Sequence, residues 1–207
     1  MKAHYEDIDE YIADLQAELE KNENCAAHHY NLGLALLSKR DFSAAEEAFL
    51  NAVRNAPHLA EAYVQLGGIC LARHDLEGCL RYNQEAASCR PKFAIPWGNI
   101  GFVHLQRGEP DEAIAALRKA LKWDPKFVQA RTGMATALYM QGDYDAAIEF
   151  CNEVIRLEAN FGPAWNNLAL VHFEKNEFAR AVECADKAQQ CGFEVRREFL
   201  AELAPHR

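Results

Sequence analysis

Residues 94–125 read AIPWGNIGFVHLQRGEPDEAIAALRKALKWDP, and they hold the clearest copy of a pattern that recurs through the chain. Two apolar segments with helical spacing flank a turn at Gly108, and Pro125 ends the second of them. A period of 34 residues that contains two helices predicts a solenoid, in which each helix pair packs on the next. The residues that repeat at this spacing are Pro57, Pro91 and Pro125; Gly33, Gly67, Gly101, Ala135 and Ala169; and Ala45, Cys79, Ala113, Ala147 and Ala181.

This stretch resembles the tetratricopeptide repeat (TPR) family, and the resemblance extends over residues 26–193. It implies an all-α fold, namely a right-handed solenoid of helix-turn-helix repeats. It also implies a general function, the binding of other proteins or peptides, but it does not identify the partner. The residues that carry the resemblance are Trp97, Ile100, Gly101, Ala113, Leu117, Ala120 and Pro125.

We predict one continuous array with a capping helix at each end. Apolar residues recur at helical spacing from Ile8 to Leu19, so a helix over residues 5–22 should cap the first repeat within an acidic segment, 1–25. A last helix in residues 194–207 should cover the fifth repeat with Phe199 and Leu203. The five repeats are predicted at 26–59, 60–93, 94–127, 128–161 and 162–193.

Two repeats depart from the pattern. Asn83 stands where other repeats carry Phe49 or Leu117, which predicts looser packing in the second repeat. Arg131 replaces the aromatic residue at the start of the fourth repeat. Both segments keep the periodicity of two helices and a turn, so the predicted architecture is unchanged.

Charge and hydropathy limit the partners and the compartment. The formal net charge is −9, and residues 1–25 carry −6 of it, which leaves about −3 on the repeats. An acidic chain without a basic stripe is not expected to bind nucleic acid or anionic membranes. No apolar run approaches the roughly 18 residues of a membrane span, and the N-terminus does not read as a signal peptide. We therefore expect a cytoplasmic protein that is not inserted in a membrane.

The sequence gives little support to an enzyme, a cofactor or a metal. It has no phosphate-binding glycine loop, no H-E-x-x-H motif and no nucleophile elbow, so we expect neither catalysis nor a small-molecule substrate. His28 and His29 adjoin Cys25, but adjacent helical residues point about 100° apart, which disfavours a metal site. His104 and His172 are predicted to be packed histidines of the core, and the seven cysteines to be reduced thiols.

Carboxamides at the sixth place of the repeats are the strongest candidate for a binding site. Asn31, Gln65, Asn99 and Asn167 occupy this place, and Gly133 interrupts the series. A carboxamide is both donor and acceptor, so a ladder of them can hold the main chain of an extended peptide. The series is similar to the asparagine ladder in the TPR arm of the O-linked N-acetylglucosamine transferases. The alternative is that these side chains bond neighbouring first helices and fasten the stack.

Apolar side chains are predicted on the same concave face, which suits a peptide with hydrophobic anchors or an amphipathic helix. Some of them could instead belong to the ordinary core. The candidate groove residues besides the ladder are Tyr30, Leu34, Phe102, Tyr139, Asn166, Leu170 and Phe173.

These observations predict a non-enzymatic protein–protein interaction adaptor that binds a peptide or helix of a partner in its concave groove. One alternative is a self-assembling scaffold, in which helix 5–22 of one copy enters the groove of the next. A second alternative is an accessory subunit of an enzyme complex, whose catalytic residues would lie on another chain.

Overall fold

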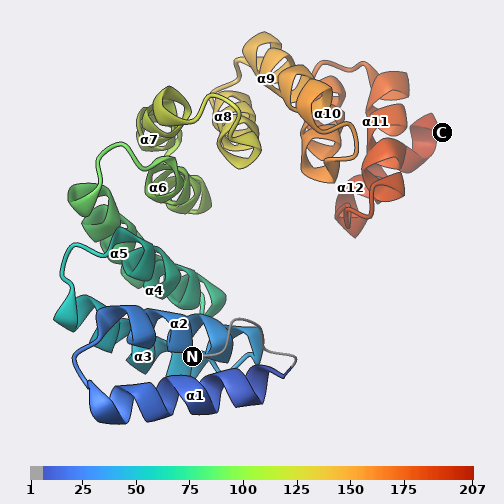
Figure 1. The fold of residues 1–207 in the computed structure, drawn as a ribbon. Helices are drawn as coiled ribbons and strands as arrows, with labels where there is room; N and C mark the ends of the chain where they lie inside the picture. The colour runs from blue at the N-terminus through green and yellow to red at the C-terminus, as the bar shows by residue number, and fades with distance from the viewer. Residues whose placement is uncertain (1–6) are drawn as a thin grey trace. The chain divides into compact units, whose positions relative to one another are not determined.

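The computed structural model describes residues 7–207, and every regular element in that range is a helix, as the all-α prediction required (Figure 1). The predicted N-terminal helix is present as α1, while Tyr5 and Glu6, where we expected it to begin, lie outside the described residues. The helices are α1 Ile8–Lys21, α2 Ala26–Ser38, α3 Phe42–Asn55, α4 Ala60–Ala72, α5 Leu76–Cys89, α6 Ala94–Gln106, α7 Pro110–Trp123, α8 Val128–Met140, α9 Tyr144–Leu157, α10 Gly162–Glu174, α11 Phe178–Gln190 and α12 Arg197–Leu203, followed by a 3₁₀ turn at Ala204–His206.

The chain forms two compact units, residues 1–99 and 100–207, and the boundary between them falls inside α6. In the first unit α2 packs on α3 and α4 packs on α5, with α1 against α2. In the second unit α8 packs on α9 and α10 packs on α11, and α9 also contacts α10. Each unit is therefore built from antiparallel helix pairs joined by short turns.

The turn inside each helix pair takes a left-handed backbone conformation at one residue. This residue recurs every 34 positions and has a positive φ because a left-handed residue ends the first helix and redirects the chain. Glycine accepts this conformation without strain, whereas a residue with a Cβ atom does so at a cost. The five residues are Arg40 (φ 61°), His74 (φ 60°), Gly108 (φ 74°), Gly142 (φ 80°) and Asn176 (φ 59°).

The second helix of three pairs starts with an aspartate cap. Asp41 accepts a hydrogen bond from the backbone N–H of Ala44 (3.1 Å), and Asp75 accepts one from Gly78 (2.8 Å). At the start of α9, Asp143 accepts a hydrogen bond from the backbone N–H of Ala146 (3.2 Å). The side chain satisfies one of the unpaired N–H groups of the first turn, which is why aspartate is favoured there.

In the other two pairs a glutamate replaces the aspartate and bonds a histidine instead of the backbone. The Nδ1 atom of His104 lies 2.6 Å from Glu109 Oε2, and that of His172 lies 2.8 Å from Glu177 Oε2. His172 is 9% exposed, in agreement with its predicted place in the core, and His104 is half-buried. Each histidine thus ties the end of a first helix to the start of the second.

One side-chain hydrogen bond recurs at the fourth place of four repeats. In each case a side-chain nitrogen reaches the backbone carbonyl of the residue six positions earlier, at the end of the preceding helix or just after it. Arg131 makes this contact through Nε, so the fourth repeat, which lacks the aromatic residue, keeps the same hydrogen bond. The contacts are His29 Nε2 to Glu23 O (2.7 Å), Trp97 Nε1 to Pro91 O (3.1 Å), Arg131 Nε to Pro125 O (2.8 Å) and Trp165 Nε1 to Ala159 O (2.8 Å).

Glycine allows α4 and α5 to approach closely around Asn83. A Cβ atom at Gly67 would lie 2.4 Å from Asn83 Nδ2, which is too close for any real contact. The Asn83 side chain is fully buried, and its Nδ2 donates to the carbonyl of Cys79 at 2.8 Å. We expected looser packing here, but the smaller side chain is enclosed and hydrogen bonded.

The capping helix α1 is held to the first repeat by both apolar and charged contacts. Leu15 is fully buried, and Asp9 forms an ion pair with Lys39 just after α2. Because α1 has its own apolar face covered in this way, it is part of the first unit rather than a separate arm.

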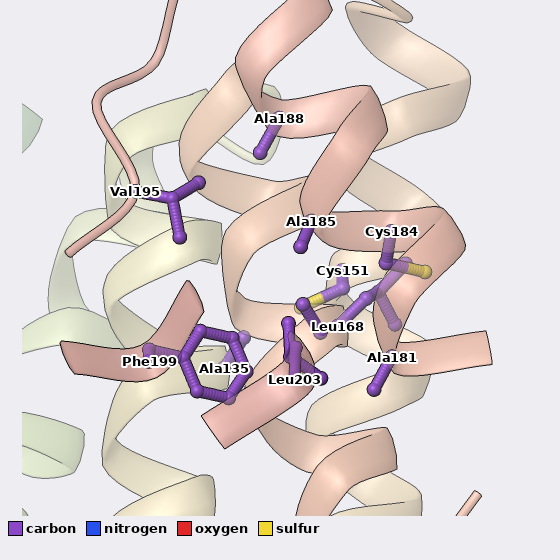
Figure 2. Packing of buried hydrophobic residues seen from close by; sticks show 11 residues of the cluster. Ala135, Cys151, Leu168, Ala181, Cys184, Ala185, Ala188, Val195, Phe199 and Leu203 are labelled. Atoms are coloured by element: carbon purple, nitrogen blue, oxygen red, sulfur yellow. The ribbon is translucent and has the colours of Figure 1, made fainter. Parts of the chain in front are cut away.

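At the other end, α12 covers the α10–α11 pair. Phe199 and Leu203 are buried in a cluster with Leu168, Cys184 and Ala185 (Figure 2). Val195, which precedes α12, is 3% exposed and belongs to the same cluster. The predicted covering role of Phe199 and Leu203 therefore agrees with their packing.

Candidate functional site

The candidate residues of the first unit lie on α2 and α4, except Asn99, which lies on α6 at the boundary of the unit. Leu34 is 37% exposed and offers apolar surface to the solvent. Tyr30 is half-buried, with its ring 5.7 Å from that of Phe49. Burial and the charge of Glu61 raise the pKa of the Tyr30 phenol, and a hydrogen bond with Gln65 opposes them. Tyr30 and Gln65 are thus brought together, and Gln65 is partly engaged inside the protein.

The asparagines of the predicted ladder differ from one another in their partners. Asn99 Nδ2 donates to Asn83 Oδ1 at 2.8 Å, so its donor is used inside the first unit. Asn31 is half-buried, and its carboxamide makes no side-chain hydrogen bond with any residue from 7 to 207. Of these two asparagines, Asn31 is the one whose carboxamide donor and acceptor are both unused within residues 7–207.

In the second unit Asn167 bonds a neighbouring first helix, α8. Its Nδ2 lies 2.8 Å from Thr136 Oγ1 and 3.5 Å from the carbonyl of Thr132, both on α8. Asn166, beside it, is half-buried, and Phe102 on α6 is 42% exposed. The contacts of Asn167 match the alternative in which these side chains bond neighbouring first helices, whereas Asn99 bonds a second helix, α5. In both asparagines the donor is used and the Oδ1 atom remains as an acceptor.

Three of the predicted residues meet at a cleft in the second unit. Tyr139 from α8 and Leu170 and Phe173 from α10 line a hollow of about 230 Å³. The remaining wall comes from the end of α10 and from the C-terminal segment. These lining residues are Glu174, at the end of α10, and Arg196, Glu198, Phe199 and Glu202 from the C-terminal segment. The repeat pattern does not predict the last four as site residues, because the C-terminal segment follows no repeat.

Aromatic packing gives this cleft a firm apolar base. The rings of Phe173 and Phe199 meet edge to face, with centroids 5.5 Å apart and planes at 82°. Phe173 also meets Phe178 at 5.5 Å and 68°. Edge-to-face pairs of this kind are favourable and directional, so the base of the cleft is preorganised. Figure 2 shows Phe199 directed towards the buried cluster from α12.

The polar part of the cleft holds a neutral phenol beside a carboxylate. Tyr139 Oη donates to Glu174 Oε1 at 3.2 Å. Burial, followed by the charge of Glu174, raises the pKa of Tyr139 to about 12, although Arg196 opposes the shift. Tyr139 therefore keeps its proton at neutral pH and acts as a hydrogen-bond donor.

Three buried thiols, those of Cys79, Cys151 and Cys184, are poor nucleophiles. Burial raises the pKa of Cys79 and of Cys184 to about 11, and that of Cys151 to about 12. The thiolate is the reactive form, so these buried cysteines are inert at neutral pH. Among residues 7–207 no group of three or more histidine, cysteine, aspartate or glutamate side chains is placed to hold a metal ion.

Three family models, each described as the tetratricopeptide repeat, match residues 7–60, 104–169 and 162–190. Together they cover more than half of the chain. The chain is a tetratricopeptide repeat protein. The resemblance seen in the sequence is confirmed at this level, while the likeness of the asparagines to those of the O-linked N-acetylglucosamine transferases stays a prediction. None of the curated proteins matches this TPR protein.

Solved structures with the same fold include other TPR proteins. YrrB, described as a TPR protein with an unusual peptide-binding site, is 19% identical, with 86% of this chain and 91% of that chain covered and a TM-score of 0.69. MamA is 20% identical, with 80% and 91% covered and a TM-score of 0.68. PilF of Pseudomonas aeruginosa is 18% identical, with 90% and 85% covered and a TM-score of 0.74. These likenesses confirm the TPR solenoid fold.

Membrane insertion can be examined from the helices themselves. In the part of the chain that the structure describes, no helix combines the length and the apolar character needed to span a bilayer.

Proposed function

We propose that this TPR protein is a non-enzymatic adaptor that holds a peptide segment of another protein against its first helices. The cleft lined by Tyr139, Leu170 and Phe173 is the observation that carries the proposal. All three residues were assigned to the groove from the repeat pattern alone, and they surround one hollow. Apolar pockets beside hydrogen-bonding groups are what a peptide with hydrophobic anchors requires.

Two further side chains extend the apolar surface of the first helices. Leu34 is 37% exposed and Phe102 is 42% exposed, although both are large and hydrophobic. Covering such side chains with a peptide removes apolar area from water, which contributes about 25 cal/mol for each Å². We expect them to contact anchors of the bound segment in their own units.

The asparagines contribute to peptide binding, but with fewer free hydrogen-bonding groups than the predicted ladder. Asn31 makes no side-chain hydrogen bond within residues 7–207, so we expect its carboxamide to offer both donor and acceptor to a peptide main chain. Asn99 and Asn167 use their N–H groups inside the protein and therefore offer an acceptor oxygen only. Their proposed partners are backbone N–H groups of the guest.

The self-assembly alternative is less favoured because α1 is occupied in its own chain. To enter a neighbouring groove, α1 would have to expose Leu15, which is fully buried, and break the Asp9–Lys39 ion pair. Exposing a leucine of this kind costs roughly 1.5–3 kcal/mol. Docking of α1 on a second copy would have to exceed that cost.

A displayed library of random dodecapeptides, selected against the immobilised full chain, tests the adaptor proposal. We expect selected peptides whose affinity, measured by fluorescence anisotropy, falls in the Phe102→Ala variant. Phe42→Ala is the matched control, because Phe42 is 40% exposed but lies on a second helix, α3. A library without binders, or an equal loss in both variants, would refute binding on the first helices.

A further inference from the structure

We propose that the cleft of the second unit takes a cationic side chain, lysine or arginine, from the bound peptide. This inference rests on the proposed function and names the chemistry of the partner. It follows from two properties of the lining, exposed glutamates and half-buried apolar side chains, which a long basic side chain satisfies together.

The charge of the cleft is negative. Glu174, Glu198 and Glu202 line it, and Arg196 is the one basic residue among its lining side chains. Glu198 and Glu202 stand four residues apart on α12, which places them on one face of the helix. Like charges at this spacing repel each other, so a cation that lies between them is favoured.

Within residues 7–207 no ion pair joins a basic side chain to Glu198 or to Glu202, although Arg196 lines the same cleft. Glu174 accepts a hydrogen bond from Tyr139, which is a neutral donor. An ammonium or guanidinium group from a partner would therefore meet carboxylates that form no ion pair with any residue from 7 to 207.

The base of the cleft fits the rest of such a side chain. Leu170 and Phe173, both half-buried, provide apolar surface in the cleft, while Glu174, Glu198 and Glu202 are exposed. Lysine and arginine carry hydrocarbon stems that pack on apolar surface while the charged end stays near water. A guanidinium or ammonium group is also attracted to the face of an aromatic ring. The volume, about 230 Å³, is below the roughly 300–1,000 Å³ of small-molecule sites, which favours one side chain over a larger ligand.

Charge also argues against the N-terminal helix of a second copy as the occupant. The described part of this segment would bring mainly carboxylates towards an acidic cleft, and like charges at close range are unfavourable. Its charged residues are Asp7, Asp9, Glu10, Asp14, Glu18, Glu20 and Lys21.

The test uses a peptide selected from the dodecapeptide library and three single variants of the full chain. Glu202→Gln removes a negative charge from the cleft, and Arg196→Gln removes the positive one. Glu149→Gln is the matched control, because Glu149 is exposed on α9 and does not line the cleft. Circular dichroism checks that each variant is folded, and fluorescence anisotropy measures affinity.

For a basic peptide we expect opposite signs from the two cleft variants. Glu202→Gln should weaken binding about threefold, Arg196→Gln should strengthen it by a similar factor, and Glu149→Gln should leave it unchanged. Acetylating the lysine of the peptide, which removes its charge and keeps its stem, should weaken binding to the native chain. Higher salt should weaken it as well, since exposed charges are screened.

The outcomes separate the two proposals. Selected peptides that lack basic residues, or that bind more tightly after Glu202→Gln, would overturn the cationic partner and leave the adaptor function in place. A preference for acidic peptides, lost in Arg196→Gln, would do the same. A library with no binder at all would overturn the adaptor function itself.

Discussion

Asn99 donates a 2.8 Å hydrogen bond from its carboxamide to that of Asn83, which is fully buried between α4 and α5. Asn99 belongs to the predicted peptide-binding ladder, whereas Asn83 occupies the place that Phe49 and Leu117 fill in other repeats. The second repeat therefore has a polar contact where its neighbours have an apolar one. This contact gives Asn99 a structural role that is independent of any guest.

Replacing Asn99 with alanine should lower the free energy of unfolding by about 1–3 kcal/mol. The substitution leaves Asn83 Oδ1 buried without a hydrogen-bond partner, and an unsatisfied buried acceptor carries a penalty of this size. Urea denaturation of both proteins measures the difference.

Asn31→Ala is the matched control for that experiment. Asn31 stands at the same place of its repeat but makes no side-chain hydrogen bond within the described chain, so we expect a change within about 0.5 kcal/mol. Equal destabilisation by the two substitutions would contradict the structural role assigned to Asn99. Of the two, Asn31→Ala is therefore the clean variant for testing the ladder in peptide binding.

Replacing His74 with glycine should stabilise the protein by up to about 1 kcal/mol. His74 is held at a φ of 60°, a left-handed conformation that disfavours a residue with a Cβ atom, whereas glycine adopts it freely. The gain is partly offset by the greater freedom of glycine in the unfolded chain. Differential scanning calorimetry should record a higher Tm.

Replacing Gly108 with alanine tests the same effect, the cost of a Cβ atom at a positive φ, in the opposite direction. Its φ is 74°, and a Cβ atom added there would meet no atom within 4 Å, so conformation alone is tested. We expect Gly108→Ala to destabilise the protein by about 1 kcal/mol. A neutral result at both positions would mean that the turns adjust their backbone without cost.

The stability supplied by Glu177 should depend on pH. Its hydrogen bond with His172 is the main reason that the pKa of Glu177 lies below the ordinary value of 4.5, with Arg180 acting in the same direction. A lowered pKa in the folded state contributes stability that is complete above 4.5 and is lost as the pH falls through the lowered value.

We therefore expect Glu177→Gln to be less stable than the native chain at pH 7 and to approach it as the pH falls below 4.5. Urea denaturation at a series of pH values measures this difference. Glu183→Gln, an exposed site on the same helix, controls for the loss of one negative charge. A difference that stays constant down to acid pH would show that the pair adds nothing through ionisation.

The repeat pattern was sufficient to predict the helix pairs and the turns. A helix depends on residues three and four positions apart, and a turn on one residue that tolerates a positive φ, so both are encoded locally. Five copies of the same local code reinforce one another. Arg131 illustrates this, because its replacement of an aromatic residue left the hydrogen bond to the preceding helix in place.

The partners of the predicted binding residues required the tertiary structure. The sequence identifies a carboxamide as donor and acceptor, but it does not say whether a guest or a neighbouring helix will satisfy it. Asn99 and Asn31 occupy equivalent places and differ because one faces Asn83 and the other has no such neighbour.

What the sequence by itself determined is the class of fold and the face on which apolar side chains gather, because both follow from spacing along a helix. What only the tertiary structure decided is the acidic cleft, because α12 follows no repeat and its position depends on how Phe199 packs against Phe173. Contacts between segments far apart in the chain depend on packing, and spacing along the sequence does not encode them.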